Sequence, residues 1–170
     1  MDGKLGIYEN PDVNAATYYS WLERTNGPDY IPGLADLSPR FYPSVVPMTQ
    51  SLASGEIGVS LFNATSIIKE FQETGAPLDH AIPDKTQASF FTASVLENAR
   101  RPDAALLFMN FLMTPAGQEA LNGSGFASSP LPDVPGTLNP PDMFVLGEPP
   151  VLTEAEVDAW NTRFKDIFKR

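Results

Sequence analysis

The sequence predicts an α/β fold in which a parallel or mixed sheet is flanked by helices. Two apolar runs, Leu5–Tyr8 and Ile57–Phe62, have the composition of strands, and apolar residues at helical spacing follow each of them. Strands that alternate with helices favour a parallel sheet. Of the 170 residues, 42% are hydrophobic and 19% are charged, so the chain can form a packed core.

Three helices are expected between these two strands. Asp12 or Asn14 can cap a helix over residues 14–25, which stops at a Gly-Pro pair. A short helix is expected within residues 29–38, where a proline follows it. A third helix is expected within residues 44–54, with a proline near its first turn and a glycine after its end.

The second strand is expected to lead directly into a helix over Asn63–Thr74, which has one apolar side and a glycine after its end. Leu78–Ile82 and Ala88–Val95 are interpreted as two further strands, separated by a Pro-Asp-Lys turn. These two runs continue the alternation of strands and helices that predicts the α/β class.

The helix expected over Asp103–Met113 is unusually apolar. Asn110 is the one polar residue within Ala104–Met113, so apolar side chains cover nearly the whole circumference. A helix with this pattern is expected to be buried on several sides. Thr114 then caps a short helix that has Pro115 at its first position.

The last part of the chain combines an irregular connection with a well-defined helix. Residues 123–150 hold 4 Gly and 7 Pro among 28 positions, which predicts a connection without regular structure. Thr153 and Glu156 have the spacing of a capping box. The helix that follows has an apolar face ending at Phe168 and basic residues in its last turn, which suit the negative end of the helix dipole.

The acidic composition excludes some classes of partner. The formal net charge is −10, whereas nucleic-acid binding requires clustered Lys and Arg to displace counterions. The same charge argues against binding to an anionic membrane surface. The chain has no cysteine and a single histidine, so disulfides, thiolate metal sites and histidine-rich metal sites are excluded, and no cofactor is expected.

The start of this sequence does not have the pattern of an export signal. No apolar run approaches the roughly 20 residues that span a bilayer. Residues 1–4 lead straight into the first strand, so no signal peptide is present. We therefore expect that this sequence is a piece of a longer chain.

The end of the second strand is the first candidate binding site. Asn63, Ala64, Thr65 and Ser66 open a helix there, so backbone N–H groups, the positive end of a helix dipole and three polar side chains converge. Ligands of open α/β sheets bind beyond the carboxyl ends of the strands. The alternative is that Asn63 is a plain N-cap and the two hydroxyl residues fill the first turn, and the local pattern favours this alternative.

The end of the first strand is the second candidate. Glu9 follows the strand, and Val13, Asn14 and Ala15 begin the next helix. The same capping alternative applies here, and it is again the more probable one on local grounds. In a parallel sheet both strand ends would lie on one edge, which makes the pair more informative than either alone.

A hydrolytic site is the third candidate. His80 stands beside Asp79, and Ser66 could act as a nucleophile with them. No G-x-S-x-G elbow supports this arrangement, and a lone histidine in an expected strand is more often structural than catalytic. The two features favour a binding protein over an enzyme.

The chain resembles type II periplasmic solute-binding proteins of ABC importers, and the ferric-ion and thiamine branch most of all. The densest match is an "A-x-x-P-x-A-A-x-x-F-x-x-F-L" helix followed by a "T-P-x-G-Q" turn. The resemblance covers nearly all of the chain, in order: Gly3–Ile7 with Pro11, Gln50–Val59, Gly75–Pro77 with Pro83, Ala93–Leu121 and Trp160–Phe168.

The resemblance implies a receptor that clamps a solute between two lobes and delivers it to a membrane permease, without chemistry and outside the cytoplasm, in the periplasm or extracellular space. It implies that residues 1–86 and 125–170 form the second lobe and that 87–124 belong to the first. Ligand-binding residues would come from two helix N-termini, which are Glu9, Val13, Asn14 and Ala15, and Asn63, Ala64, Thr65 and Ser66.

Two departures from the family sharpen this expectation. Ferric-ion members carry adjacent tyrosines where this chain has Thr65 and Ser66, so a small polar or anionic organic solute is expected instead of ferric iron. The first-lobe portion that precedes Gly3–Ile7 in the family is missing. The apolar helix 104–113 would normally pack into that portion, so we expect it to mediate a homodimer or to recruit a partner lobe in the isolated chain.

Overall fold

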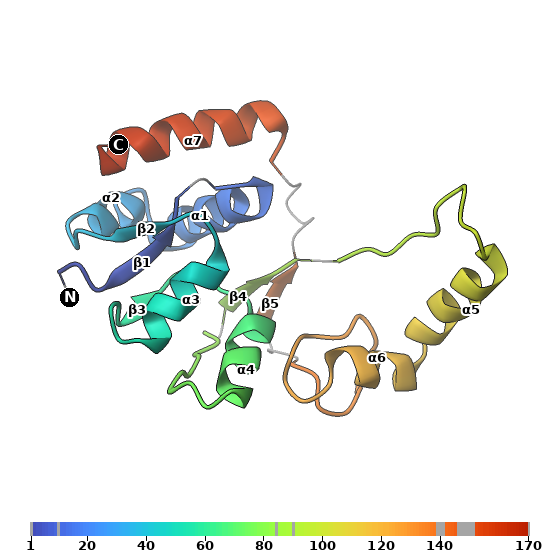
Figure 1. Cartoon of the computed structure of the whole chain (residues 1–170). Helices are drawn as coiled ribbons and strands as arrows, with labels where there is room; N and C mark the ends of the chain where they lie inside the picture. Colours follow the sequence, from blue (N-terminus) through green and yellow to red (C-terminus); the bar gives the residue numbers. More distant parts are fainter. Residues whose placement is uncertain are drawn as a thin grey trace. The chain divides into compact units, whose positions relative to one another are not determined.

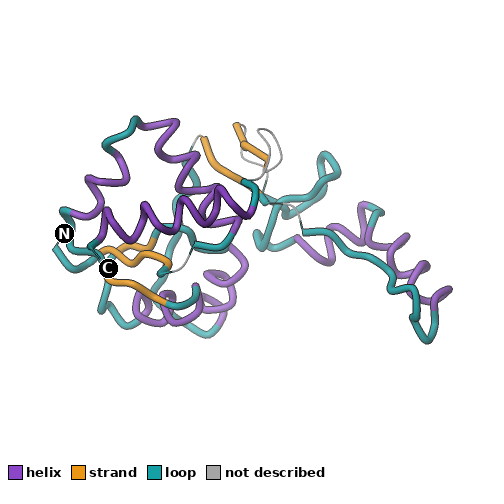
Figure 2. Tube along the Cα trace, turned by 90° about the horizontal axis from the view of Figure 1, so that it is seen from above, coloured by secondary structure: helices purple, strands orange, loops and turns teal. Residues whose placement is uncertain are grey.

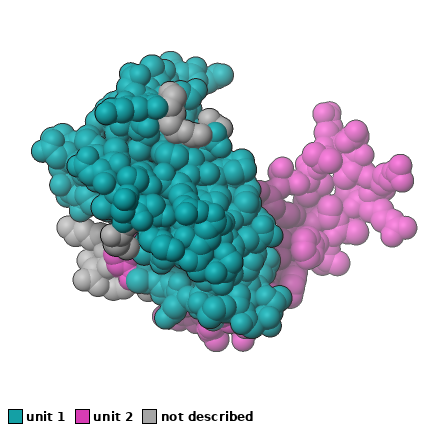
Figure 3. Space-filling model, turned by 60° about the vertical axis from the view of Figure 1, so that its left-hand side comes forward, with its two compact units in different colours: residues 1–81, 144–170 teal, residues 82–143 magenta. Residues whose placement is uncertain are grey.

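The computed structural model describes residues 2–9, 11–83, 85–89, 91–138, 142–145 and 152–169. The chain forms two compact units, which are coloured separately in Figure 3. Unit 1 comprises residues 1–81 and 144–170, and unit 2 comprises residues 82–143. In the part of the chain that the structure describes, no helix has the length and apolarity that crossing a membrane requires.

Unit 1 is built on a three-stranded parallel sheet. Strand β1 (Leu5–Tyr8) lies in the centre, between β2 (Arg40–Tyr42) and β3 (Val59–Ser60). Ile7 is paired with Phe41 on one side of β1, and Gly6 is paired with Ser60 on the other. Because the strands are parallel, all three carboxyl ends lie on the same edge of the sheet.

Helices cover both faces of this sheet (Figure 1). Helices α1 (Val13–Asn26), α2 (Tyr30–Ala35) and α7 (Glu154–Phe168) pack on one another over one face. Helices α3 (Val45–Ala53) and α4 (Thr65–Glu73) pack on each other, and α3 covers the opposite face of β1. Figure 2 shows the strands in orange between these helices. The predicted α/β class with a parallel sheet flanked by helices is confirmed.

The alternation of side chains along β1 explains the two layers. Leu5 and Ile7 are buried in the cluster that faces α1, α2 and α7. Gly6 faces α3, because a Cβ at this position would lie 2.5 Å from Ile57 Cδ1 and 3.1 Å from Met48 Cγ. A glycine is therefore required where α3 crosses the central strand closely.

An aromatic and aliphatic core joins the N-terminal and C-terminal segments of unit 1. Tyr19 of α1 and Phe164 of α7 have ring centroids 5.3 Å apart, and Phe41 of β2 meets Phe164 edge-on. Burial at this scale is the main source of folding free energy for the unit. The buried members of the core are Leu5, Ile7, Ala15, Tyr19, Leu22, Ile31 and Phe164.

Unit 2 contains a helical hairpin. Helix α5 (Pro102–Leu112) is followed by α6 (Pro115–Asn122). Strand β4 (Lys85–Ala88) pairs with β5 (Asp142–Val145), in which the chain passes from unit 2 to unit 1. The turn of the hairpin is closed by hydrogen bonds. Thr114 Oγ1 accepts from the Gly117 N–H at 3.1 Å, and the Gln118 amide donates to the Leu112 carbonyl at 2.7 Å.

The helices agree with the sequence prediction, whereas two expected strands, the burial of one helix and the irregular connection are wrong. All seven expected helices form, including the capping box of α7 between Thr153 and Glu156. The expected strand at Leu78–Ile82 is absent, and within Ala88–Val95 the described residues form no strand beyond the end of β4. These runs have strand composition, but composition forms a strand only where a neighbouring strand supplies hydrogen bonds.

Burial of the apolar helix is the third wrong prediction. No residue of α5 is buried, and the exposed fractions of Leu107 and Phe108 are 72% and 57%. Helix α5 packs on α6, but among the described residues of unit 2 nothing buries its apolar side chains. Strand β2 was not predicted from the sequence, and β5 forms within 123–150, where no regular structure was expected.

Candidate functional site

Three strand ends and three helix starts meet at the carboxyl edge of the unit 1 sheet. Each strand runs directly into a helix at this edge: β1 into α1, β2 into α3, and β3 into α4. The Glu9 N–H donates to the Tyr42 carbonyl at 2.8 Å, and the Leu61 N–H donates to the Gly6 carbonyl at 3.1 Å. These bonds hold the strand ends side by side, so the two candidate sites predicted from the sequence share one edge.

The N-terminus of α1 is already capped by the chain itself. Asp12 Oδ1 accepts hydrogen bonds from the N–H groups of Asn14, at 3.0 Å, and Ala15, at 2.9 Å. The Ala15 side chain is fully buried in the core, whereas Val13 is exposed. This end of the edge therefore presents a carboxylate to solvent, and two of the predicted backbone donors are engaged by it.

The N-terminus of α4 has a different arrangement. The N-cap residue is Ala64, and no side chain caps the helix. Asn63 Oδ1 accepts from the Ala64 N–H at 2.9 Å, and its Nδ2 donates to Thr49 Oγ1 at 2.9 Å and to Ser60 Oγ at 3.2 Å. Asn63 is therefore not the plain N-cap of the alternative reading, because its amide ties the strand end to the fully buried Thr49 of α3.

Ala64 is exposed at this helix start, and Thr65 and Ser66 are half-buried. A helix of nine residues without a side-chain cap directs the positive end of its dipole toward this edge. The four residues of the first candidate site therefore lie where a polar or anionic group would be stabilised.

A third helix start lies at the same edge, although the sequence predicted the helix within residues 44–54 and not its place at this edge. Ser44 is the N-cap of α3, with an extended backbone and no side-chain cap bond, and it is half-buried. It went unrecognised because β2 was not predicted, so no strand end was expected before it. The sequence offered one signal for this N-cap, which is a serine two residues before the Val-Pro pair at the start of a helix.

An aromatic group at this edge was also missed. Phe62, directly after β3, has a φ of 58°, a left-handed conformation that is rare for a bulky residue. Its ring stacks against Tyr8 with centroids 6.2 Å apart and lies 5.5 Å from Tyr18. Burial, with a smaller contribution from Tyr30, raises the pKa of the Tyr18 phenol to about 12, so this group stays neutral at physiological pH.

Asp79 and His80, two of the residues proposed for hydrolysis, do not make the carboxylate–imidazole hydrogen bond of a catalytic triad. The Asp79 carboxylate accepts from the main-chain N–H of His80, at 2.8 Å, and not from its imidazole. His80 Nδ1 is buried without a hydrogen-bond partner among the described residues. Within those same residues, His, Asp and Glu side chains do not gather in groups of three that could hold a metal ion.

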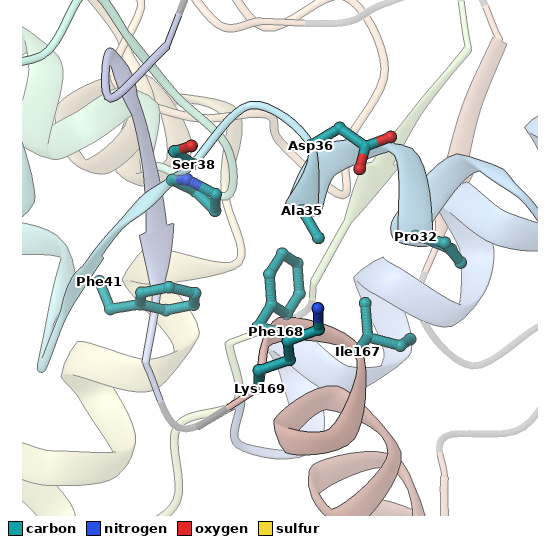
Figure 4. A pocket seen from close by; sticks show the side chains of 9 residues that line it. Pro32, Ala35, Asp36, Ser38, Phe41, Ile167, Phe168 and Lys169 are labelled. Carbon is teal, nitrogen blue, oxygen red and sulfur yellow. The ribbon is translucent and has the colours of Figure 1, made fainter.

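A pocket of about 390 Å³ opens at the other end of the sheet (Figure 4). It lies beside the start of β2, between the C-terminal ends of α2 and α7. None of the predicted site residues is part of it. The residues that line it are Pro32, Ala35, Asp36, Ser38, Pro39, Phe41, Ile167, Phe168 and Lys169.

Comparison with known proteins identifies the family. The family model described as bacterial extracellular solute-binding protein matches residues 8–127, which is more than half of the chain and includes every strand end and helix start of the carboxyl edge. Searches among curated proteins and among solved structures found no match. On the strength of the family match, this chain belongs to the family of bacterial extracellular solute-binding proteins.

Proposed function

We propose that the chain is the solute-binding component of an ABC-type importer and captures a small polar or anionic solute at the carboxyl edge of the unit 1 sheet. The observation that carries this proposal is the family match over residues 8–127, which spans that edge from Tyr8 to Ser66. The protein would act in the periplasm or extracellular space and would pass its solute to a membrane permease. No cofactor and no chemical step are part of the proposal.

The two sides of the edge would contribute differently to binding. At the start of α4, Asn63, Ala64, Thr65 and Ser66 bring an uncapped helix N-terminus and hydroxyl groups, which suit the negative end of a solute. On the other side, the carboxylates of Glu9 and of Asp12, which caps α1, disfavour a second negative charge. Val13, Asn14 and Ala15 would then shape this side, mainly through their main chain.

We propose that the two units correspond to the two lobes that the sequence resemblance implies. Unit 1 would be the second lobe, predicted as residues 1–86 and 125–170, and the predicted first-lobe segment, 87–124, falls within unit 2. The boundaries differ, because unit 2 also contains residues 82–86 and 125–143. Capture would then proceed by closure of a first lobe over the edge of unit 1. Membership of the ferric-ion and thiamine branch is proposed in the same way, with Thr65 and Ser66 in place of tyrosines.

The exposed apolar residues of α5 support a further part of the proposal, which is self-association of the isolated chain through residues 104–113. Leu106, Leu107, Phe108 and Phe111 are all exposed on this helix. Native mass spectrometry of the purified chain measures the association directly. A dimer that disappears in Leu107→Glu would support it, and a monomer across the accessible concentration range would contradict it.

Isothermal titration calorimetry with a panel of small sugars, carboxylates and inorganic anions tests the binding function. A solute that binds the wild-type chain should bind at least about tenfold more weakly to Thr65→Ala/Ser66→Ala, because hydroxyl groups beside a helix N-terminus are lost. The matched control is Ser54→Ala/Thr74→Ala, which removes two hydroxyls from the opposite ends of α3 and α4.

The control variant should bind as the wild type does. Equal affinity of the site variant and the wild type would show that the α4 start is not the binding site. Failure of every solute to bind would count against the function itself. Hydrolysis of any panel member that is lost in His80→Ala would instead favour an enzyme.

A further inference from the structure

Phe62 occupies an unusual place at the carboxyl edge. Tyr8 is the last residue of β1, and Tyr18 belongs to α1, the helix that follows this strand. The Phe62 ring is close to both, at centroid distances of 6.2 Å and 5.5 Å. All three residues pack against the buried cluster of unit 1. Phe62 therefore lies at the carboxyl end of the sheet, beside the end of β1.

The backbone of Phe62 accounts for this position. An extended conformation would continue the alternation of β3 and direct the side chain to one face. The positive φ of 58° turns the chain instead, and the next residue, Asn63, is held to Thr49 and Ser60 by its amide. The conformation is costly for a phenylalanine, because only glycine adopts it freely.

The ring is half-buried, so part of its surface stays open to solvent at the edge. The same edge carries polar groups: the uncapped starts of α3 and α4, with Ser44 and Ser66, and the carboxylate of Asp12 at the start of α1. The edge therefore combines a flat apolar surface with polar groups on its rim. A compact inorganic anion would use the rim and leave the ring uncovered.

We infer that the solute carries a ring with one flat apolar face and polar groups on its periphery, as pyranose sugars and aromatic carboxylates do, and that it stacks on Phe62. This inference deepens the proposed function and depends on it. Stacking on an aromatic ring gains favourable contact without requiring a hydrogen-bond partner for each atom of the solute. Phe62 is then a specificity-determining residue, which selects ring-bearing solutes over compact ones.

Calorimetric titrations with four probes test this inference on the intact chain. The probes are D-glucose and 4-hydroxybenzoate, which carry rings, and inorganic phosphate and acetate, which do not. We expect one ring-bearing probe to bind, and the probe that binds identifies sugar or aromatic acid as the class. Binding of phosphate or acetate without either ring-bearing probe would overturn the inference but leave the proposed function in place.

Two variants separate stacking from folding. Phe62→Tyr keeps the ring and should bind the ring-bearing probe within about twofold of the wild type, whereas Phe62→Leu should bind it about tenfold more weakly. The matched control is Phe168→Leu, a half-buried ring that packs on Phe41 at the opposite end of the sheet, and its affinity should be unchanged. Equal affinity of Phe62→Leu and the wild type, with both melting at the same temperature, would overturn the inference.

Discussion

Helices α1 and α5 show that an apolar sequence alone does not decide whether a helix is buried. In unit 1, α1 carries charged residues and still buries Ala15, Tyr19 and Leu22, because β1 and α7 lie opposite it. In unit 2, α5 is far more apolar and buries no residue. Burial therefore depends on the surface that the rest of the fold places opposite a helix.

The two units consequently differ in how they hold together. Unit 1 has a continuous core from seven buried residues. In the described part of unit 2, the buried residues are Gly117, Gln118 and Val134, so local hydrogen bonds at the α5–α6 turn carry most of its order. We expect unit 1 to unfold as one cooperative body and unit 2 to open locally at lower free energy.

The largest expected effect tests the core of unit 1. Phe164→Ala removes a ring that is 2% exposed and touches Tyr19, Phe41 and Phe168, so it should lower the free energy of unfolding by about 3–5 kcal/mol. The matched change in unit 2 is Leu107→Ala, at a residue that is 72% exposed, and it should change stability by less than about 0.5 kcal/mol. Urea titration measures both, and similar losses would remove the distinction between the units.

The second-largest expected effect tests whether the stability of unit 2 depends on the turn between α5 and α6. A Cβ at Gly117 would overlap the main-chain carbonyl oxygen of Phe111, which cannot rotate away, so Gly117→Ala should cost about 1–3 kcal/mol. Amide exchange should accelerate in α6 and stay unchanged in unit 1. Gly33→Ala in α2 is the control, because nothing lies within 4 Å of a Cβ there. Faster exchange throughout unit 1 would show that the units unfold together.

Matched helix caps provide a finer test. Asp12 caps α1 in unit 1, and Thr114 caps α6 in unit 2. Replacing either by Ala should cost about 1 kcal/mol. In Asp12→Ala the loss should appear in the global urea transition, whereas in Thr114→Ala it should appear only as faster amide exchange within the hairpin. A shift of the global transition by Thr114→Ala would argue that the hairpin belongs to the cooperative body.

The smallest effect concerns pH. Arg163 of α7 donates hydrogen bonds to Glu23 of α1, one of them at 2.7 Å, and these bonds lower the Glu23 pKa below its ordinary value near 4.5. The stabilisation is therefore present above about pH 4.5 and is lost as the pH falls through the lowered pKa. Partial exposure limits it to about 1 kcal/mol or less.

Glu23→Gln is the variant that isolates this pair. It should remove that part of the acid dependence of unit 1 stability, with no change in unit 2 exchange. Urea midpoints measured between pH 3 and pH 7 check both statements. An unchanged acid profile in Glu23→Gln would show that other carboxylates govern it.

The same dependence on opposing surfaces explains which elements could be predicted from the sequence. Helix starts and ends follow from neighbouring residues, so α1, α3 and α7 were expected close to where they form. Strand β2 has three residues and exists because β1 supplies its hydrogen bonds, which no local pattern reveals. The runs at 78–82 and 89–95 have strand composition but no such neighbour in the described part of the chain.

The candidate site was predictable to the same extent. Its two flanking helix starts followed from strand–helix junctions, and their placement on one edge followed from the parallel sheet. The sequence could not distinguish the roles of Asp12 and Asn63. The local pattern at both helix starts was compatible with capping, and the actual role depends on which hydrogen bonds each side chain makes. Ser44 and Phe62 could not be assigned, because the first depends on β2 and the second on a backbone turn within an apolar run.

The packing of α7 on α1 has a consequence for how the protein is made. Glu23 and Arg163 are 140 positions apart, and Phe164 enters the core only after all the residues between them have been synthesised. During synthesis, the apolar surface of residues 1–81 that α7 will cover therefore stays exposed while residues 82–143 are added. Unit 1 therefore remains incompletely folded until α7 has been synthesised, and a polypeptide in that state exposes apolar surface to which chaperones can bind.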